Sequence, residues 1–202
     1  MEHRRRRRLA AFGGVVGPAA FVVAWAVLGR RVPGYSPVDD AISRLAATGA
    51  PDRAAMTAGL VAFGVGLPLY GTALRAALPG PAWAFATATG LATLGVAAVP
   101  LGSPARDAAH GVVAGAAYAT LAATPLAASR PLARSGCRRL ARSGAWAGTI
   151  SAASLLATTA GPASGLFQRV GLTVADAWIA ASAVALLRGG PAPGAPAGGR
   201  RR

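Results

Sequence analysis

Six long apolar runs constrain the fold of this chain more than any other feature. Each holds 19 to 25 residues, and at a rise of about 1.5 Å per residue a helix of this length crosses the roughly 30 Å hydrocarbon layer of a bilayer. The runs are apolar on nearly all sides, which is typical of helices surrounded by lipid. They cover residues 9–29, 54–78, 82–101, 108–129, 143–161 and 166–187. We therefore predict an all-α fold, a polytopic transmembrane bundle of six spanning helices.

The composition agrees with a membrane protein and argues against a nucleic-acid partner. Of the 202 residues, 53% are hydrophobic and 13% are charged, whereas about a quarter of a soluble domain is charged. The net charge of +15 comes from 21 basic residues, all of them Arg. These Arg residues lie between and beyond the apolar runs without interleaved aromatic residues, as topology signals do. We expect no nucleic acid among the partners.

The Arg distribution predicts the orientation in the membrane. Six crossings place both termini on one side, which carries 15 Arg residues against six on the other side. The positive-inside rule then makes both termini cytoplasmic. The abundance of Ala, Gly, Pro and Arg suggests a GC-rich bacterial genome, so we expect a multi-pass protein of the bacterial inner membrane.

The two ends of the chain differ from the predicted membrane domain, residues 9–188. Residues 1–8 are a basic arm that we expect in the cytoplasm, and residues 189–202 form a Gly-, Pro- and Arg-rich tail that we expect to be disordered. The basic arm and first run also resemble a secretory signal. A retained helix is favoured because the run is longer than a signal core and Arg30 and Arg31 follow it.

The connection between the first two runs predicts a short helix on the outer side. Ser36 and Asp39 have the spacing of a capping box, and Pro37 suits the first helical position. Ile42, Leu45 and Ala46 then share one face, and Gly49 is suited to end the helix. We expect this amphipathic helix at the membrane surface or in the mouth of the bundle.

Asp176 is the most informative polar residue, because it lies in the middle of the last apolar run. A carboxylate at bilayer depth is costly, so it usually faces the bundle interior and has a partner. Arg169 lies seven residues earlier on the same helix face, about 10 Å away along the axis. Ser and Thr side chains of neighbouring helices are alternative partners. Both a binding site and a structural polar contact remain open for Asp176.

The start of the fourth run holds a second polar pair. Asp107 and His110 are three residues apart and share a face, but a backbone carbonyl or water would satisfy His110 equally well. One Cys and two His give no disulfide and no metal-type spacing. His3 and His110 would lie on opposite sides of the membrane, so we expect no metal and no cofactor.

Three stretches resemble a known family. They are GYSPVDDAISRLAATGAP from Gly34 to Pro51, the pair His110–Gly111, and GLFQRV from Gly165 to Val170. Together with the six-span layout, they resemble the domain of unknown function 998 family over roughly residues 11–187. This resemblance implies a membrane-embedded bacterial or archaeal protein, with recurrent polar residues at Asp40, Ser43, His110, Gln168 and Arg169. Arg44 stands where the family commonly has an acid.

Three functions are compatible with these residues. The preferred one is an outward-facing polar cavity that binds a lipid headgroup or small polar solute. Its candidate ligand-binding residues are Asp40, Ser43, His110, Gln168, Arg169 and Asp176.

The alternatives are an enzyme and an assembly protein. An intramembrane hydrolase would use Ser43 as nucleophile, His110 as base, and Asp107 or Asp40 as the orienting acid. An assembly protein would form a homo-oligomer through small-residue helix faces. Pairs with GxxxG spacing occur at Gly13 and Gly17, Gly111 and Gly115, and Gly144 and Gly148. We expect membrane lipid as the partner in the preferred function.

Overall fold

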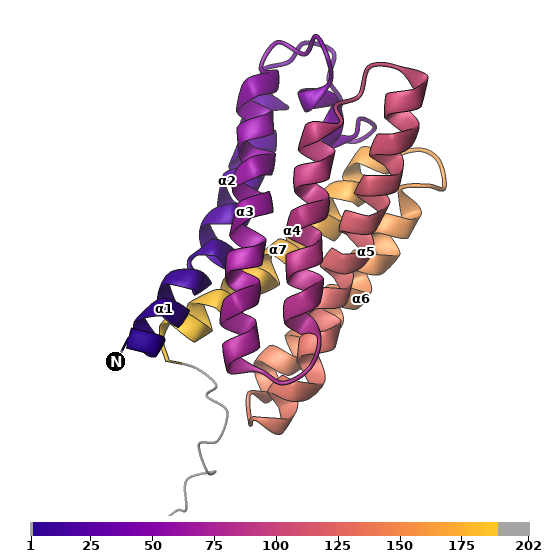
Figure 1. Ribbon diagram of the computed structural model, residues 1–202. Coiled ribbons are helices and arrows are strands. Elements are labelled where there is room, and N and C mark those ends of the chain that lie inside the picture. The colour runs from indigo at the N-terminus through magenta and orange to yellow at the C-terminus, as the bar shows by residue number, and fades with distance from the viewer. Residues whose placement is uncertain (1, 190–202) are drawn as a thin grey trace, which may run out of the picture.

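The described part of the chain, residues 2–189 of a computed structural model, is built from helices that run up and down in one bundle (Figure 1). Helix α1 leads into α2, and η1 is a 3₁₀ helix in the long connection that follows. The elements are α1 (Glu2–Ala11), α2 (Gly13–Leu28), η1 (Ile42–Ala46), α3 (Arg53–Ala77), α4 (Ala82–Ala98), α5 (Pro104–Arg134), α6 (Arg138–Ala157) and α7 (Ser164–Leu187). We call the end of the bundle that holds residues 29–52 the loop end.

Successive helices pack side by side, and α7 also contacts α2 and α5. Small residues make several of these contacts close. Gly13 and Gly17 of α2 lie against the backbone of α3 around Gly66, and Gly148 of α6 lies against Leu126 of α5. The pair Gly111 and Gly115 differs, because a Cβ atom at either position would meet no described atom within 4 Å.

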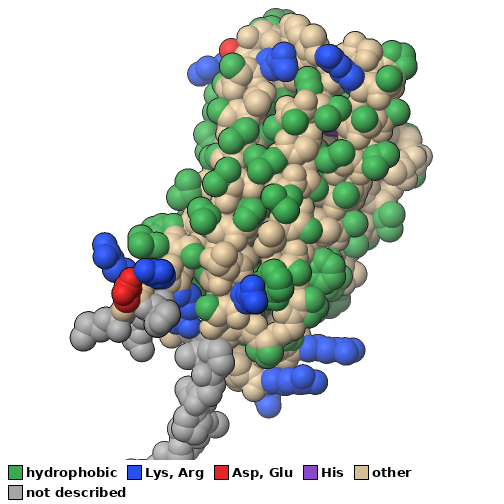
Figure 2. Space-filling view, in the orientation of Figure 1, with side chains coloured by type: hydrophobic (Ala, Val, Ile, Leu, Met, Phe, Trp, Pro, Cys, Tyr) green, Lys and Arg blue, Asp and Glu red, His purple; other side chains and the backbone are tan. Residues whose placement is uncertain are grey.

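The flank of the bundle is apolar along its whole length. Figure 2 shows hydrophobic side chains from one end of the visible face to the other, with Arg side chains at the two ends. Val112 is 76% exposed, Leu156 72% and Trp146 68%, and soluble monomers rarely leave so much apolar surface to water. Among the described residues, four helices are long and apolar enough to cross a membrane: Arg5–Leu28, α3, α5 and α7. The fold is therefore that of a multi-pass membrane protein.

The helix ends correct several predicted spans. The predicted span 82–101 is helical only to Ala98, so α4 is a shorter apolar helix. The predicted span 143–161 is shifted to Arg138–Ala157; its Arg, Gly and Ser residues lower the hydropathy, and α6 is not among the four candidates. The predicted span 108–129 extends to Pro104–Arg134. Of the predicted tail, 189–202, all but Gly189 lies outside the described residues.

The predicted helix starting at Ser36 is wrong in form. The Ser36 amide donates to Asp40 Oδ2 (2.8 Å) and the Asp39 amide to Ser36 Oγ (3.2 Å). These bonds close a turn rather than start a helix, and the extended backbone at Ala41 then precedes the five-residue η1. The shared apolar face is confirmed, since Ile42, Leu45 and Ala46 are all buried in the mouth of the bundle.

Candidate functional site

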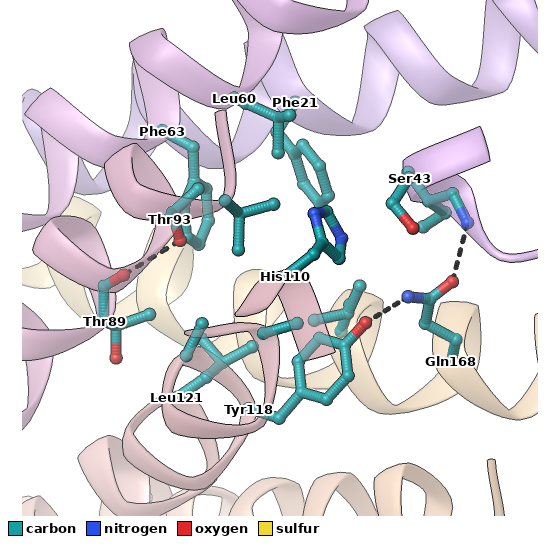
Figure 3. A pocket seen from close by; sticks show the side chains of 15 residues that line it. Phe21, Ser43, Leu60, Phe63, Thr89, Thr93, His110, Tyr118, Leu121 and Gln168 are labelled. Carbon is teal, nitrogen blue, oxygen red and sulfur yellow. Dashed lines mark hydrogen bonds between the residues drawn. The ribbon is translucent and has the colours of Figure 1, made fainter. Parts of the chain in front are cut away.

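A small cavity lies where η1 meets the helices at the loop end (Figure 3). Its volume is about 50 Å³, room for a few waters or one small chemical group, whereas whole drug-sized ligands occupy pockets of about 300 Å³ or more. Its walls come from α2, η1, α3, α4, α5 and α7. The polar side chains in the lining are Ser43, Thr89, Thr93, His110, Tyr118 and Gln168.

Gln168 joins three segments around this cavity. It lies in the first turns of α7, and its Oε1 accepts a hydrogen bond from the Ile42 amide of η1 (2.8 Å). Its Nε2 donates to the Tyr118 hydroxyl of α5. The side chain is buried, so each bond shields a polar group that would be costly to leave unpaired. Gln168 therefore fixes η1 relative to α5.

His110 presents one ring nitrogen to the cavity. Its Nδ1 lies 2.7 Å from the Val99 carbonyl oxygen at the end of α4. Because a carbonyl only accepts, Nδ1 is the donor, and in the neutral ring Nε2 is left as an acceptor. No described residue hydrogen-bonds to Nε2. Figure 3 shows the ring among Phe21, Ser43 and Tyr118.

Arg169 holds the outer loop onto α7. Its Nη1 donates to the carbonyls of Pro37 (2.7 Å), Asp40 (3.0 Å) and Gly165 (2.8 Å). Its Nη2 donates to the Tyr35 hydroxyl. The guanidinium also lies 5.5 Å from the centre of the Tyr35 ring, within cation–π range. The residue is only 7% exposed. Its Nη1 and Nη2 donors bind the loop and its own helix, whereas the buried Nε has no hydrogen-bond partner among the described residues.

The surroundings of Arg169 explain two more residues. A Cβ atom at Gly165 would lie 2.9 Å from the Asp40 amide nitrogen, so glycine lets the loop approach the helix. The Asp40 carboxylate faces the loop surface, where its Oδ1 lies 3.0 Å from Arg44 Nη1. Burial raises the pKa of the Tyr35 phenol, against the opposing effect of the Arg169 charge.

The sequence-predicted site residues fall into three places. Ser43, His110 and Gln168 line the cavity. Asp40 and Arg169 belong to the adjoining loop contacts. Asp176 is separate from both, deeper in α7.

Asp176 is buried in the interior, as expected for a carboxyl group at this depth, but without the expected partner. It is 2% exposed, and neither carboxyl oxygen has a hydrogen-bond partner among residues 2–189. The alternative of a hydrogen bond to a Ser or Thr side chain is therefore not realised among these residues. A helical sequence gives the face and depth of a residue, but it does not give the atoms opposite it.

Of the two alternatives for His110, the structure has the bond to a backbone carbonyl and not the pairing with Asp107. Asp107 Oδ1 instead accepts a bond from the Gly102 amide (2.9 Å), which stabilises the turn before α5. The Val99 carbonyl takes the place beside His110 that a triad acid would need. No hydrogen bond joins Ser43 to His110 within the described chain, and no cluster of three or more potential metal ligands occurs there.

Sequence reasoning missed the aromatic hydroxyls of this region. Tyr118 lines the cavity and binds Gln168, and Tyr35 binds Arg169. Tyr35 lies within the family-like stretch from Gly34 to Pro51, so its position could have marked it as a candidate site residue. Tyr118 lies eight residues after His110 on α5, about two helical turns along the same face, and this spacing could have linked the two.

The fold defines a class: a multi-pass helical membrane protein. A comparison with family models identifies the family. The chain belongs to the family described as "Protein of unknown function (DUF998)", whose model matches residues 15–185, and the resemblance seen in the sequence is confirmed. No curated protein and no solved structure matches the chain.

Proposed function

We propose that this protein binds a small hydrogen-bonding group, either part of a lipid headgroup or a small polar solute, in the cavity formed by Ser43, His110 and Gln168. The supporting observation is the convergence of these side chains from η1, α5 and α7 on one cavity. Nothing in this proposal requires a chemical reaction, so the protein acts as a binding or transport-like protein.

The polar groups of the cavity favour an uncharged ligand group. The lining residues include neither a carboxylate nor a guanidinium. His110 Nε2 offers one bond, and the Ser43 hydroxyl has no hydrogen bond to any of the residues 2–189. Thr93 Oγ1 already donates to the Thr89 carbonyl (2.8 Å), so it is left as an acceptor. Hydroxyl groups, such as those of glycerol or a sugar, match this set of donors and acceptors.

The apolar walls make these few bonds selective. Phe21, Leu60 and Phe63 line the same cavity and make much of its wall apolar. A hydrogen bond in such surroundings is electrostatically stronger than one in water, and an unmatched polar group is more costly. In this proposal, Arg169 and Asp40 position the loop above the cavity, and Asp176 does not contact the ligand.

Binding is tested through the ligand that purifies with the protein. Wild type, S43A and H110A are extracted in detergent, and bound small molecules are identified by mass spectrometry. The loss of one hydrogen bond of about 1.4 kcal/mol lowers affinity about tenfold, so both variants should retain about a tenth of the ligand. S143A is the matched control, because Ser143 is an exposed residue whose hydroxyl donates to its own helix. Unchanged ligand content in H110A would refute the proposal.

We also propose six crossings, with both termini in the cytoplasm of a bacterium and the loop end outside. Support comes from the alternating course of α2 to α7 (Figure 1) and from the apolar side chains that α6 exposes, Trp146, Ile150 and Leu156. The Arg distribution sets the orientation.

Cys137, the single cysteine, provides the test of this topology. It lies in the connection between α5 and α6, at the cytoplasmic side in this proposal. A membrane-impermeant maleimide should label it only after the cells are permeabilised. In a C137S background, A160C in the α6–α7 connection should react in intact cells. Labelling of Cys137 in intact cells would reverse the orientation.

A further inference from the structure

A groove on the lipid-facing flank runs between α5 and α6. Its volume is about 540 Å³, and it is lined by small and apolar residues with Thr158 and Thr159 at one end. Along α5 it extends from Gly111 to Leu126, about 22 Å at the helical rise. This length exceeds one leaflet, half of the roughly 30 Å hydrocarbon layer.

The GxxxG pair of α5 creates much of this space. Gly111 and Gly115 line the groove, and a Cβ built on either meets no described atom within 4 Å beyond the adjoining residues and backbone of α5 itself. Gly148, by contrast, is packed against Leu126 of α5. Within the described residues, the pair at 111 and 115 therefore serves no helix contact.

The groove and the polar cavity share a wall. Ala114 and Tyr118 line both of them. The Tyr118 hydroxyl binds Gln168 on the cavity side, while another part of the residue borders the groove. The cavity, with its polar side chains, and the long apolar groove are therefore adjacent on α5, as an amphiphilic ligand would require.

We propose that the groove holds an acyl chain of a membrane lipid whose hydroxyl-bearing headgroup reaches the cavity; this inference rests on the proposed function. The volume lies within the range of small-molecule sites. Moving a chain from bulk lipid into the groove brings no hydrophobic gain, because lipid tails are as apolar as the lining. The groove therefore sets the position of the chain, and the cavity selects the headgroup.

The test fills the groove without disturbing the fold. In G115L a leucine side chain occupies the open space, and leucine favours a helix more than glycine does. A116L is the matched control, since Ala116 is exposed on the same turn of α5 and does not line the groove. The proteins are reconstituted in phosphatidylethanolamine vesicles containing phosphatidylglycerol with a diazirine on one acyl chain. Crosslinks are located by peptide mass spectrometry after irradiation.

We expect wild type and A116L to be labelled at groove residues of α5 and α6, and G115L to lose at least four-fifths of that labelling. Equal labelling in G115L would overturn the acyl-chain site. A change in oligomer mass in G115L with unchanged labelling would also overturn it and would assign the groove to a second copy of the chain.

A third variant separates this inference from the proposed function. If H110A loses its co-purified ligand while G115L keeps full labelling, the cavity is the binding site and only the groove is refuted. If H110A keeps its ligand, the proposed function itself fails.

Discussion

Replacement of Arg169 by methionine should release the outer loop from the bundle. The substitution keeps an apolar stem but removes bonds to the carbonyls of Pro37 and Asp40 and to the Tyr35 hydroxyl. Each of these three loop bonds contributes about 1 to 1.5 kcal/mol net, so the loop should lose about 3 to 5 kcal/mol. By the rule of tenfold per 1.4 kcal/mol, amide exchange in the loop should rise by about a hundredfold to a few thousandfold.

Hydrogen exchange with mass spectrometry, on protein in detergent micelles, measures this effect. R169M should speed exchange in residues 35–46 and leave the middle of α3 unchanged. R169K should give a smaller effect, because an ammonium cannot reproduce the planar fork of donors. R75M is the control, since Arg75 stacks 4.8 Å from the centre of the Trp83 ring, far along the chain from the loop. Unaltered loop exchange in R169M would show that these three bonds do not hold the loop.

Three further predictions concern single residues. D176V should raise the unfolding temperature, corresponding to about 1 to 3 kcal/mol, because the buried carboxyl has no partner among the described residues; a lower temperature would contradict this. G66A should destabilise the protein by about 1 to 3 kcal/mol, since the added Cβ would lie 2.6 Å from the Gly13 carbonyl oxygen. G111A should leave the stability unchanged or raise it by up to about 1 kcal/mol. Equal melting curves for the two variants would refute the packing argument. Burial raises the pKa of the Tyr35 phenol above its ordinary 10.0, so the contribution of Tyr35 to loop stability should be intact below about pH 10 and fall as the pH rises through the raised pKa. The difference in tyrosinate absorbance between wild type and Y35F measures the pKa of Tyr35. A titration midpoint below 10 would contradict the prediction.

The sequence predicted the parts of the fold that depend on hydrophobic pattern. The apolar runs gave the helices, and the spacing of Ile42, Leu45 and Ala46 gave the face of η1 that is buried. The placement of Ser43, His110 and Gln168 at one end was also predictable, because the loop and the starts of the fourth and sixth runs all lie on the same side of an alternating bundle.

The contacts made with backbone atoms were not predictable. Arg169 binds loop carbonyls and Asp107 binds the Gly102 amide, and every residue offers the same backbone groups. Side-chain types therefore suggested a ligand for Arg169 and a histidine for Asp107, whereas the folded chain supplies backbone partners to both. The 3₁₀ form of η1 has the same cause, since the turn at Ser36 is closed by side chains that a helix would have used as caps.

The anchoring of the loop bears on how a ligand reaches the cavity. On the loop side, η1 is tied down by the bond from Ile42 to Gln168, and the preceding turn is tied down by Arg169. Entry from water that displaces η1 or this turn has to break these bonds. On the flank, only the Ala114–Tyr118 wall of α5 separates the cavity from the groove, and one hydrogen bond, from Gln168, holds the Tyr118 hydroxyl. Rotation of Tyr118 breaks fewer hydrogen bonds than release of the loop, so under the proposed function the membrane route costs fewer hydrogen bonds. Within the proposed function, this asymmetry favours a lipid over a water-borne solute as the ligand.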